Sequence, residues 1–183
     1  WFYQITVLSG RFEDLRRVFD RLGGGDLRIQ AILIAFCFGG LLEALAGFGA
    51  PVAITATMIL ALGVKPLKAA ITVLLANTAP VAFGAVAVPI TTAGDVGGKD
   101  AHMIATIVGH QAPFLAMLVP LILLVILDGM KGLKDAWLPA LVIGVSFAIA
   151  QWVTAATPAY NLTDVVACIV SMGVAVIFLQ FWK

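Results

Sequence analysis

Charged side chains are scarce in this sequence of 183 residues. Only 11% of the residues are Asp, Glu, Lys or Arg, 62% are hydrophobic, and the formal net charge is +1. A soluble domain is usually about half apolar and about a quarter charged. The composition therefore argues against a soluble domain, and the near-neutral charge gives no indication of a nucleic-acid partner.

Residues that bind metals or carry out catalysis are also few. The sequence has two Cys and two His. Cys37 and Cys168 lie far apart in apolar segments, so we expect small buried side chains, with no disulfide and no metal site. Ser-His-Asp and dinucleotide-binding patterns are missing, and GGKD at 97–100 lacks the residues of a phosphate loop. We predict no enzyme and no cofactor.

Long apolar runs dominate the rest of the chain. Four stretches contain no charged residue at all: 69–94, 103–127, 136–163 and 165–182. A helix needs roughly 20 apolar residues to cross a bilayer. The runs predict an all-α integral membrane protein, a polytopic helical bundle.

One segment, RFEDLRRVFDRLGGGDLR at 11–28, is rich in charge. Its apolar residues recur at helical spacing on one face: Phe12, Leu15, Phe19 and Leu22. This pattern is typical of an amphipathic helix on the membrane surface, and a solvated connecting loop is the alternative. We expect residues 1–28 to hold the end of a preceding span followed by this cytoplasmic segment.

The run from 29 to 64 is too long for one straight crossing, and it is divided at Gly47–Pro51. If it returns to its starting side and each later run crosses once, ten of the eleven Lys and Arg residues share one face and Lys99 lies on the other. A single crossing would split them six to five. Because Lys and Arg concentrate on the cytoplasmic side, we predict a return path. The second arm, 51–63, is short, which favours a re-entrant hairpin over two spans.

Two stretches inside the apolar runs break helices. The first is EALAGFGAP at 43–51, and the second is ANTAP at 76–80. Glycine frees the backbone to turn, Asn or Thr caps a new helix, and proline suits its first turn. We expect helices to restart near Pro51 and near Pro80. Two discontinuous helices near the bilayer midplane are typical of the substrate site of secondary transporters.

The chemistry available at these breaks suits an anion. New helix N-termini expose backbone N–H groups, and no Lys or Arg lies in the interior of the runs. An anionic substrate is therefore expected to bind the N-termini together with Asn77 and Thr78. Glu43 is the one charged residue between Ile29 and Val64. Ionisable groups inside membranes mark ion or proton paths by default, so we assign Glu43 to proton coupling, with a structural carboxyl as the alternative.

The sequence IQAILIAFCFGGLLEALAGFGAPVAI (29–54), followed by ANTAPVAFGAVAVPITT (76–92), resembles the lactate permease family of bacteria and archaea. The resemblance covers essentially all of this chain and about a third of a typical member. It implies proton-coupled symport of L-lactate, with D-lactate and glycolate as further substrates, across the bacterial cytoplasmic membrane. The family signature falls on Glu43, Gly47, Phe48, Gly49, Pro51, Asn77, Thr78, Pro80 and Gly84.

One part of the signature departs from the family pattern. Members often have Glu-Gly-Ala-Ala-Gly-Phe-Gly-Thr-Pro, whereas Leu45 and Ala50 stand here in place of smaller or hydroxylated residues. This departure affects which hydroxy acid is preferred more than the transport class. The Asn-Thr tip also resembles that of a wider ion-transporter superfamily with inverted repeats, in which this chain would form one repeat.

The prediction is a secondary carrier with residues 29–94 as its transport core and three further transmembrane helices in 95–183. The substrate-binding residues are Gly47, Phe48, Gly49, Pro51, Asn77, Thr78 and Pro80, and Glu43 couples the proton. The expected partners are a small monocarboxylate, protons and the lipid bilayer, with a homo-oligomer left open. The alternatives are a sodium-coupled organic-anion carrier, a channel and a structural membrane subunit.

Overall fold

The structure, a computed structural model, describes residues 9–47 and 49–182, and all regular elements in these ranges are helical. The prediction of an all-α protein is confirmed. In chain order the elements are α2 (Arg11–Leu22), α3 (Leu27–Ile32), the π-helix η1 (Leu33–Phe38), α4 (Gly39–Ala46), α5 (Ala50–Ala61), α6 (Pro66–Ala76), the 3₁₀-helix η2 (Ala85–Ala87), α7 (Val88–Gly97), α8 (Ala101–Ala155), the 3₁₀-helix η3 (Tyr160–Leu162) and α9 (Thr163–Phe181).

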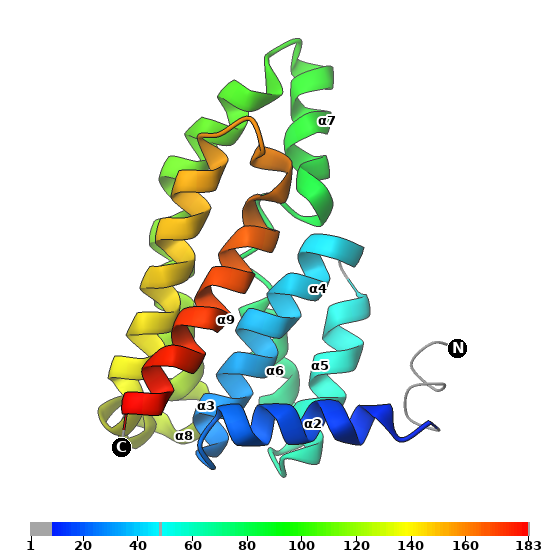
Figure 1. Cartoon of the computed structure of the whole chain (residues 1–183). Coiled ribbons are helices and arrows are strands. Elements are labelled where there is room, and N and C mark those ends of the chain that lie inside the picture. Colours follow the sequence, from blue (N-terminus) through cyan, green and yellow to red (C-terminus); the bar gives the residue numbers. More distant parts are fainter. Residues whose placement is uncertain (1–8, 48, 183) are drawn as a thin grey trace.

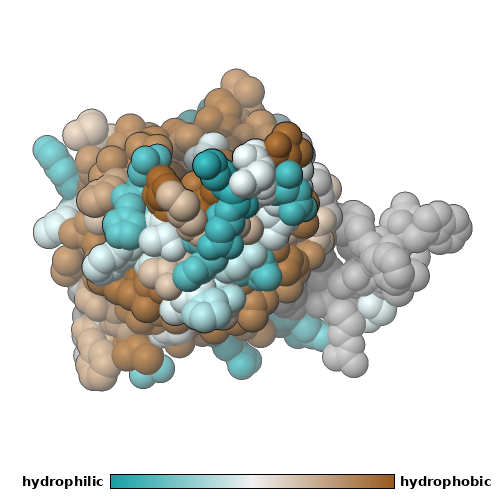
Figure 2. Space-filling model, turned by 90° about the horizontal axis from the view of Figure 1, so that it is seen from above, coloured by the Kyte–Doolittle hydropathy of each residue, from teal (hydrophilic) through white to brown (hydrophobic). Residues whose placement is uncertain are grey.

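Three helical stretches are long and apolar enough to cross a membrane within the part of the chain that the structure describes. They are Leu27–Ala46, Ala101–Ala155 and Tyr160–Phe181. Seen from the end that carries α7, hydrophilic residues gather in the middle of the face and hydrophobic residues surround them (Figure 2). This is the surface of a bundle whose sides meet lipid and whose end meets water, as predicted for a multi-pass membrane protein.

Helix α8 turns back on itself. Its backbone leaves the helical region at Asp128 and Gly129, at the start of the segment DGMKGLKD (128–135), and again at Ala136 directly after it. The two limbs are antiparallel and very close, because Gly109 lies directly against Ala155 and Gly144 against the backbone of Met117. With α9 beside them they form three long limbs along one side of the bundle (Figure 1).

Helix α2 lies across one end of the bundle (Figure 1). Phe19 anchors it, since this side chain is 3% exposed and its ring centroid is 5.4 Å from that of Phe38. The segment is therefore a helix and not a connecting loop. Its position on a membrane surface stays a prediction.

The run from 29 to 64 returns to the end of the bundle where it began. The continuous helix Leu27–Ala46 rises, and α5 descends beside α4 (Figure 1). With 12 residues, α5 is about 18 Å long, which is shorter than the roughly 30 Å hydrocarbon core of a bilayer. The return path agrees with the charge distribution, and its re-entrant placement in a bilayer stays a prediction.

Two features of the core concern cysteines and the π-helix. Cys37 and Cys168 are free and buried, so the expectation of small buried side chains is confirmed. Cys37 belongs to η1, a stretch that the sequence did not predict and that lies in the core through Leu33 to Cys37. π-helical turns bond residue i to i+5 and occur often at functional sites.

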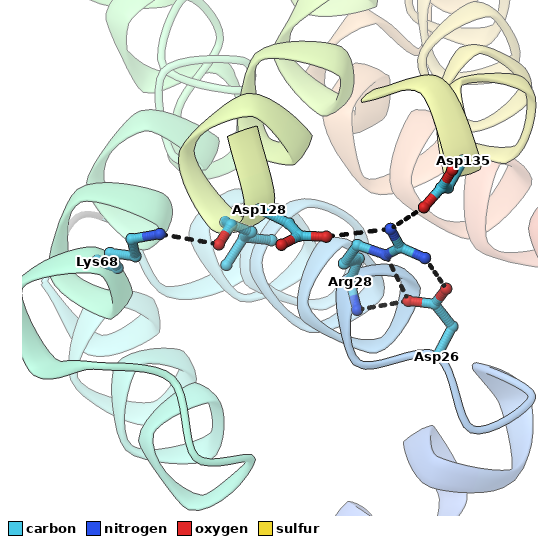
Figure 3. A network of polar contacts seen from close by, with 6 residues as sticks. Asp26, Arg28, Lys68, Asp128 and Asp135 are labelled. Carbon is cyan, nitrogen blue, oxygen red and sulfur yellow. Dashed lines mark hydrogen bonds and ion pairs between the residues drawn. The ribbon is translucent and has the colours of Figure 1, made fainter. Parts of the chain in front are cut away.

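A network of polar contacts fastens three segments at the α2 end of the bundle (Figure 3). The guanidinium of Arg28 donates to Asp26, at 2.8 Å from Nη2, and from Nη1 to Asp128 and Asp135 at 3.2 and 3.1 Å. Beside it, the Lys68 ammonium donates to the carbonyl of Leu127 at 3.0 Å. The start of α3 and the turn inside α8 therefore share one cation.

Replacing Arg28 by Gln is expected to destabilise the protein, because three carboxylates lose their only cation in this network. We expect a loss of about 1 kcal/mol at low salt that shrinks as salt screens the partly exposed charges. The hydrogen bond from Arg28 holds the pKa of Asp26 below its ordinary 3.8. The contribution of Asp26 to the free energy of unfolding is therefore complete at neutral pH. It disappears as the pH falls below 3.8 and through the folded-state pKa.

Thermal unfolding of the detergent-solubilised protein at neutral and acid pH measures this effect. Lys131→Gln is the matched control, since it removes a cation from the same loop without touching the network. Equal losses in the two variants, or a loss that does not depend on salt, would contradict the assignment.

Candidate functional site

The first break has the form that the sequence predicts. Gly47 ends α4 at φ 77°, Gly49 precedes α5 at φ 108°, and Pro51 lies in the first turn of α5. Both glycines have a positive φ, which other residues adopt only with strain. The prediction of a helix restart near Pro51 is confirmed. Phe48 lies outside the described residues.

The second break differs from the expectation, and the prediction of a helix restart near Pro80 is wrong. The N–H groups of Thr78 and Ala79 donate to the carbonyls of Leu75 and Ala76, at 3.0 and 3.3 Å. These donors close the end of α6, so they cannot form a new N-terminus, and the anion site expected at a helix N-terminus near Pro80 is not present in that form.

The chain needs several more residues to change direction before a helix can begin again. Gly84 has φ 57°, and the non-glycine residues Val86 and Ala87 have φ 48° and 56°. Helix α7 then begins at Val88, with Pro89 in its first turn. The break therefore extends over residues 77–87, more than twice the length of the quoted ANTAP stretch.

The two breaks lie against each other. A Cβ placed on Gly47 would be 3.5 Å from the Cβ of Ala85, and one placed on Gly40 would be 3.8 Å from the Cγ of Pro80. The side chain of Asn77 hydrogen-bonds the carboxyl of Glu43. Asn77 and Glu43 are 5% and 2% exposed, so a buried polar pair joins the two breaks.

The remaining predicted residues are placed in different surroundings. Pro51 is buried, and its carbonyl accepts from the Thr55 hydroxyl at 2.7 Å. Gly49 is exposed, with open space where a Cβ would be. Thr78 is exposed, and its hydroxyl already donates to the carbonyl of Leu75 at 2.6 Å. The structure thus brings Glu43, Gly47, Asn77 and Pro80 together, whereas Thr78 is exposed and bonded within α6.

Sequence reasoning missed two buried polar residues beside this pair. Gln151 Nε2 donates to Asp164 Oδ1 at 2.8 Å, and the side chains are 0% and 2% exposed. Asp164 lies close enough to Glu43 for the two charges to interact. An acidic residue in the first turn of a helix usually serves the helix dipole at the surface, so Asp164 gave no sign of burial. Gln151, within the uncharged run 136–163, was the available signal.

Metal binding is not supported by the side chains that the structure describes. Among residues 9–47 and 49–182 no group of three or more His, Cys, Asp or Glu could hold a metal ion. The two carboxyls and two amides form what we call the polar centre. They are Glu43 of α4, Asn77 of the second break, Gln151 of α8 and Asp164 of α9.

Comparison with known proteins gives a consistent picture. A family model described as L-lactate permease matches residues 1–183. The glycolate permease GlcA of Escherichia coli K12 is 48% identical over 99% of this chain and 32% of its own length. The L-lactate permeases of Bacillus subtilis 168 and E. coli K12 are 45% and 43% identical, again over 99% of this chain and 32% and 33% of their own lengths.

The chain thus spans about a third of the length of these relatives. No solved structure matches it significantly. The family and these relatives are described as permeases, which are transporters and not enzymes.

The tight contact beside the polar centre provides a test of this geometry. A Cβ on Gly40 would come within 2.9 Å of the Cys168 Sγ, so Gly40→Ala is expected to push α4 from α9 and to cost about 1–3 kcal/mol. Adding Cys168→Ala removes the obstructing sulfur and should restore part of the loss. The measurement is thermal unfolding of the full-length protein in detergent.

Gly173→Ala is the matched control, because that glycine lies on α9 with nothing within 4 Å of a new Cβ. If Gly40→Ala is as stable as this control, or if Cys168→Ala makes it worse, the packing of α4 on α9 is not as described.

Proposed function

Because this chain belongs to the L-lactate permease family, we propose that the full-length protein carries a small 2-hydroxy monocarboxylate, L-lactate or glycolate, into the cell together with protons. The membrane is the bacterial cytoplasmic membrane, and residues 29–94 form this chain's share of the transport core. The names of the relatives supply the two candidate substrates, since they include both L-lactate permeases and a glycolate permease.

The observation that carries the proposal is the meeting of two helix breaks around Glu43 and Asn77. Unwound backbone inside a membrane persists only where protein or a watery cavity surrounds it. Secondary transporters place substrate at such breaks, because half-helices offer unpaired backbone groups to a ligand. Here the Glu43–Asn77 hydrogen bond places a titratable group directly at this location.

The substrate carboxylate is assigned to the first break. The first N–H groups of a helix have no intrahelical partner and carry a partial positive charge. At α5 these include Ala50 and Val52, whereas Pro51 has no N–H and the N–H of Ala53 donates to Gly49 at 3.2 Å. Gly49 is exposed and leaves room for an anion to approach the backbone.

The substrate hydroxyl is assigned to the second break. Asn77 offers both a donor and an acceptor, and it is preferred to Thr78 because the Thr78 hydroxyl is occupied by Leu75. Gly47, Phe48 and Pro80 border the site in this proposal, and Pro51 orients the first turn of α5.

The proton is assigned to Glu43. An ionised carboxyl buried without a cation is costly, and a second anion beside it would raise that cost. A proton on Glu43 removes this repulsion, so a protonated carrier binds the monocarboxylate more readily than an ionised one. The proton and the anion then cross the membrane together, and a pH gradient drives accumulation.

Uptake of labelled L-lactate into proteoliposomes with the full-length protein tests the proposal. We expect accumulation under an inward proton gradient, none under a sodium gradient, and loss of accumulation in Glu43→Gln, while exchange of lactate across the membrane persists. Asp95→Asn, which alters an exposed carboxyl near the end of α7, is the matched control and should behave as the wild type.

Accumulation that follows sodium would identify a sodium-coupled carrier. Flux that only equalises the two concentrations would identify a channel. Glycolate and D-lactate offered as competitors give the order of preference among hydroxy acids.

A further inference from the structure

Three buried oxygen atoms in the polar centre have no hydrogen-bond partner among the residues that the structure describes. They are Glu43 Oε2, Gln151 Oε1 and Asp164 Oδ2. All three accept hydrogen bonds and none donates when the carboxyls are ionised. An unmet buried acceptor costs roughly 1–3 kcal/mol. The centre is therefore short of donors.

The packing of α4 on α9 places the two carboxyls at the same level. In Figure 1 the two helices run in opposite directions side by side, and Gly40 meets Cys168 at their contact. Glu43 lies about one turn beyond Gly40, and Asp164 about one turn before Cys168, both on the contact face. The two charges interact accordingly.

The described residues around the two carboxyls do not supply a compensating cation. The titratable groups that interact with Asp164 on the packed elements are Glu43 and Cys168, and Cys168 in turn interacts with Cys37. Elements α4, η1 and α9 contain no Lys, Arg or His. The cations of the other neighbours are engaged elsewhere: Lys68 of α6 bonds Leu127, and His102 of α8 packs on Tyr160 at 5.8 Å and contacts the Ala156 carbonyl at 3.2 Å.

On α8, Lys131 and Lys134 lie in the turn beside the Arg28 network, and His110 is exposed opposite Trp152. These three therefore do not face the carboxyls either. Burial makes each of the two negative charges costly, and the charges also repel each other. One proton relieves both problems, since it removes one charge and turns one acceptor into a donor.

We infer that Glu43 and Asp164 form a single proton-sharing pair, in which Asp164 is a second proton-carrying group of the transport cycle and Gln151 holds its carboxyl in position. This inference rests on the proposed function, because it concerns how the transported proton is held. In the exchange, an O–H bond breaks at one carboxyl and forms at the other, so the donor becomes a carboxylate and the acceptor a neutral acid. Asp164 lies in the first turn of α9, directly after the loop at 156–162, whereas Glu43 faces the two breaks, so the pair extends from that loop to the substrate site.

The test compares Asp164→Asn, Glu43→Gln, the double variant and the control Asp95→Asn, each in the full-length protein. Asp164→Asn keeps the size of the side chain and its contact with Gln151 but cannot carry a proton. We expect the ratio of proton-driven accumulation to lactate exchange to fall about tenfold or more in each single variant. The double variant should be no worse than either single variant, because residues that act as one unit are not additive.

An infrared difference spectrum between acid and neutral pH provides a readout that needs no transport. The wild type should show the carbonyl band of a protonated carboxyl, and Asp164→Asn should lose or shift it. Gln151→Leu should keep the band but move its frequency, because the carboxyl loses its hydrogen-bond donor. This second variant and readout remain decisive if Asp164→Asn folds poorly.

The possible outcomes separate the two proposals. Wild-type uptake that ignores the proton gradient overturns the proposed function, while a band that depends on Asp164 would still support the pair. Proton-driven wild-type uptake that is unchanged in Asp164→Asn, with an unchanged band, overturns the pair alone. Additive losses in the double variant also overturn it, because they indicate two independent sites. A sodium-dependent change in place of the proton band would assign these oxygens to sodium.

Discussion

The need to satisfy every backbone polar group inside a bilayer governs this structure. Lipid offers no hydrogen bonds, so a chain that leaves the helical state must be enclosed by protein or meet water. In the proposed placement within the bilayer, the described chain does so at the first break, marked by Gly47 and Gly49, and at the second break, 77–87. The two breaks lie together through the Gly47–Ala85 contact, so one enclosure serves both. The remaining helices are arranged around this requirement.

Close packing of the surrounding helices depends on small residues. A side chain at Gly40 would collide with Cys168, one at Gly109 with Ala155, and one at Gly144 with the backbone of Met117. Apolar helices in lipid gain little from the hydrophobic effect against one another, and close van der Waals contact at small residues replaces it. The Gly40–Cys168 contact aligns α4 with α9 and thereby brings Glu43 to the level of Asp164.

The second break is only partly covered by the described residues. Val81, Val86 and Val88 are 54%, 44% and 56% exposed, next to backbone that is not regularly bonded. Such backbone cannot face lipid. Because the chain corresponds to about a third of its relatives, the rest of the full-length protein or a watery cavity has to occupy that side.

Sequence patterns predicted those parts of the fold that depend on local composition. The uncharged runs predicted the long helices. Gly47, Gly49 and Pro51 predicted the first break, because the backbone preferences of glycine and proline act locally. The helix restart after the second break was misplaced because Asn77 and Thr78 suit the end of a helix as well as the start of one. Their N–H groups donate to Val73 and Leu75 and so end α6. Asp164 and Gln151 were missed because their burial depends on how α8 and α9 meet, which no local pattern contains.

The π-helical turn at Leu33–Phe38 has a mechanical consequence for Glu43. It stores one surplus residue between the firmly placed start of α3 and the polar centre at the end of α4. Drawing that residue into ordinary α-helical bonding would rotate α4 by about 100° and move it by about 1.5 Å along its axis. The carboxyl would then swing from the α9 face to another face of the bundle while Arg28 stayed fastened. A screw motion of one residue is thus enough to change which side of the bundle Glu43 faces.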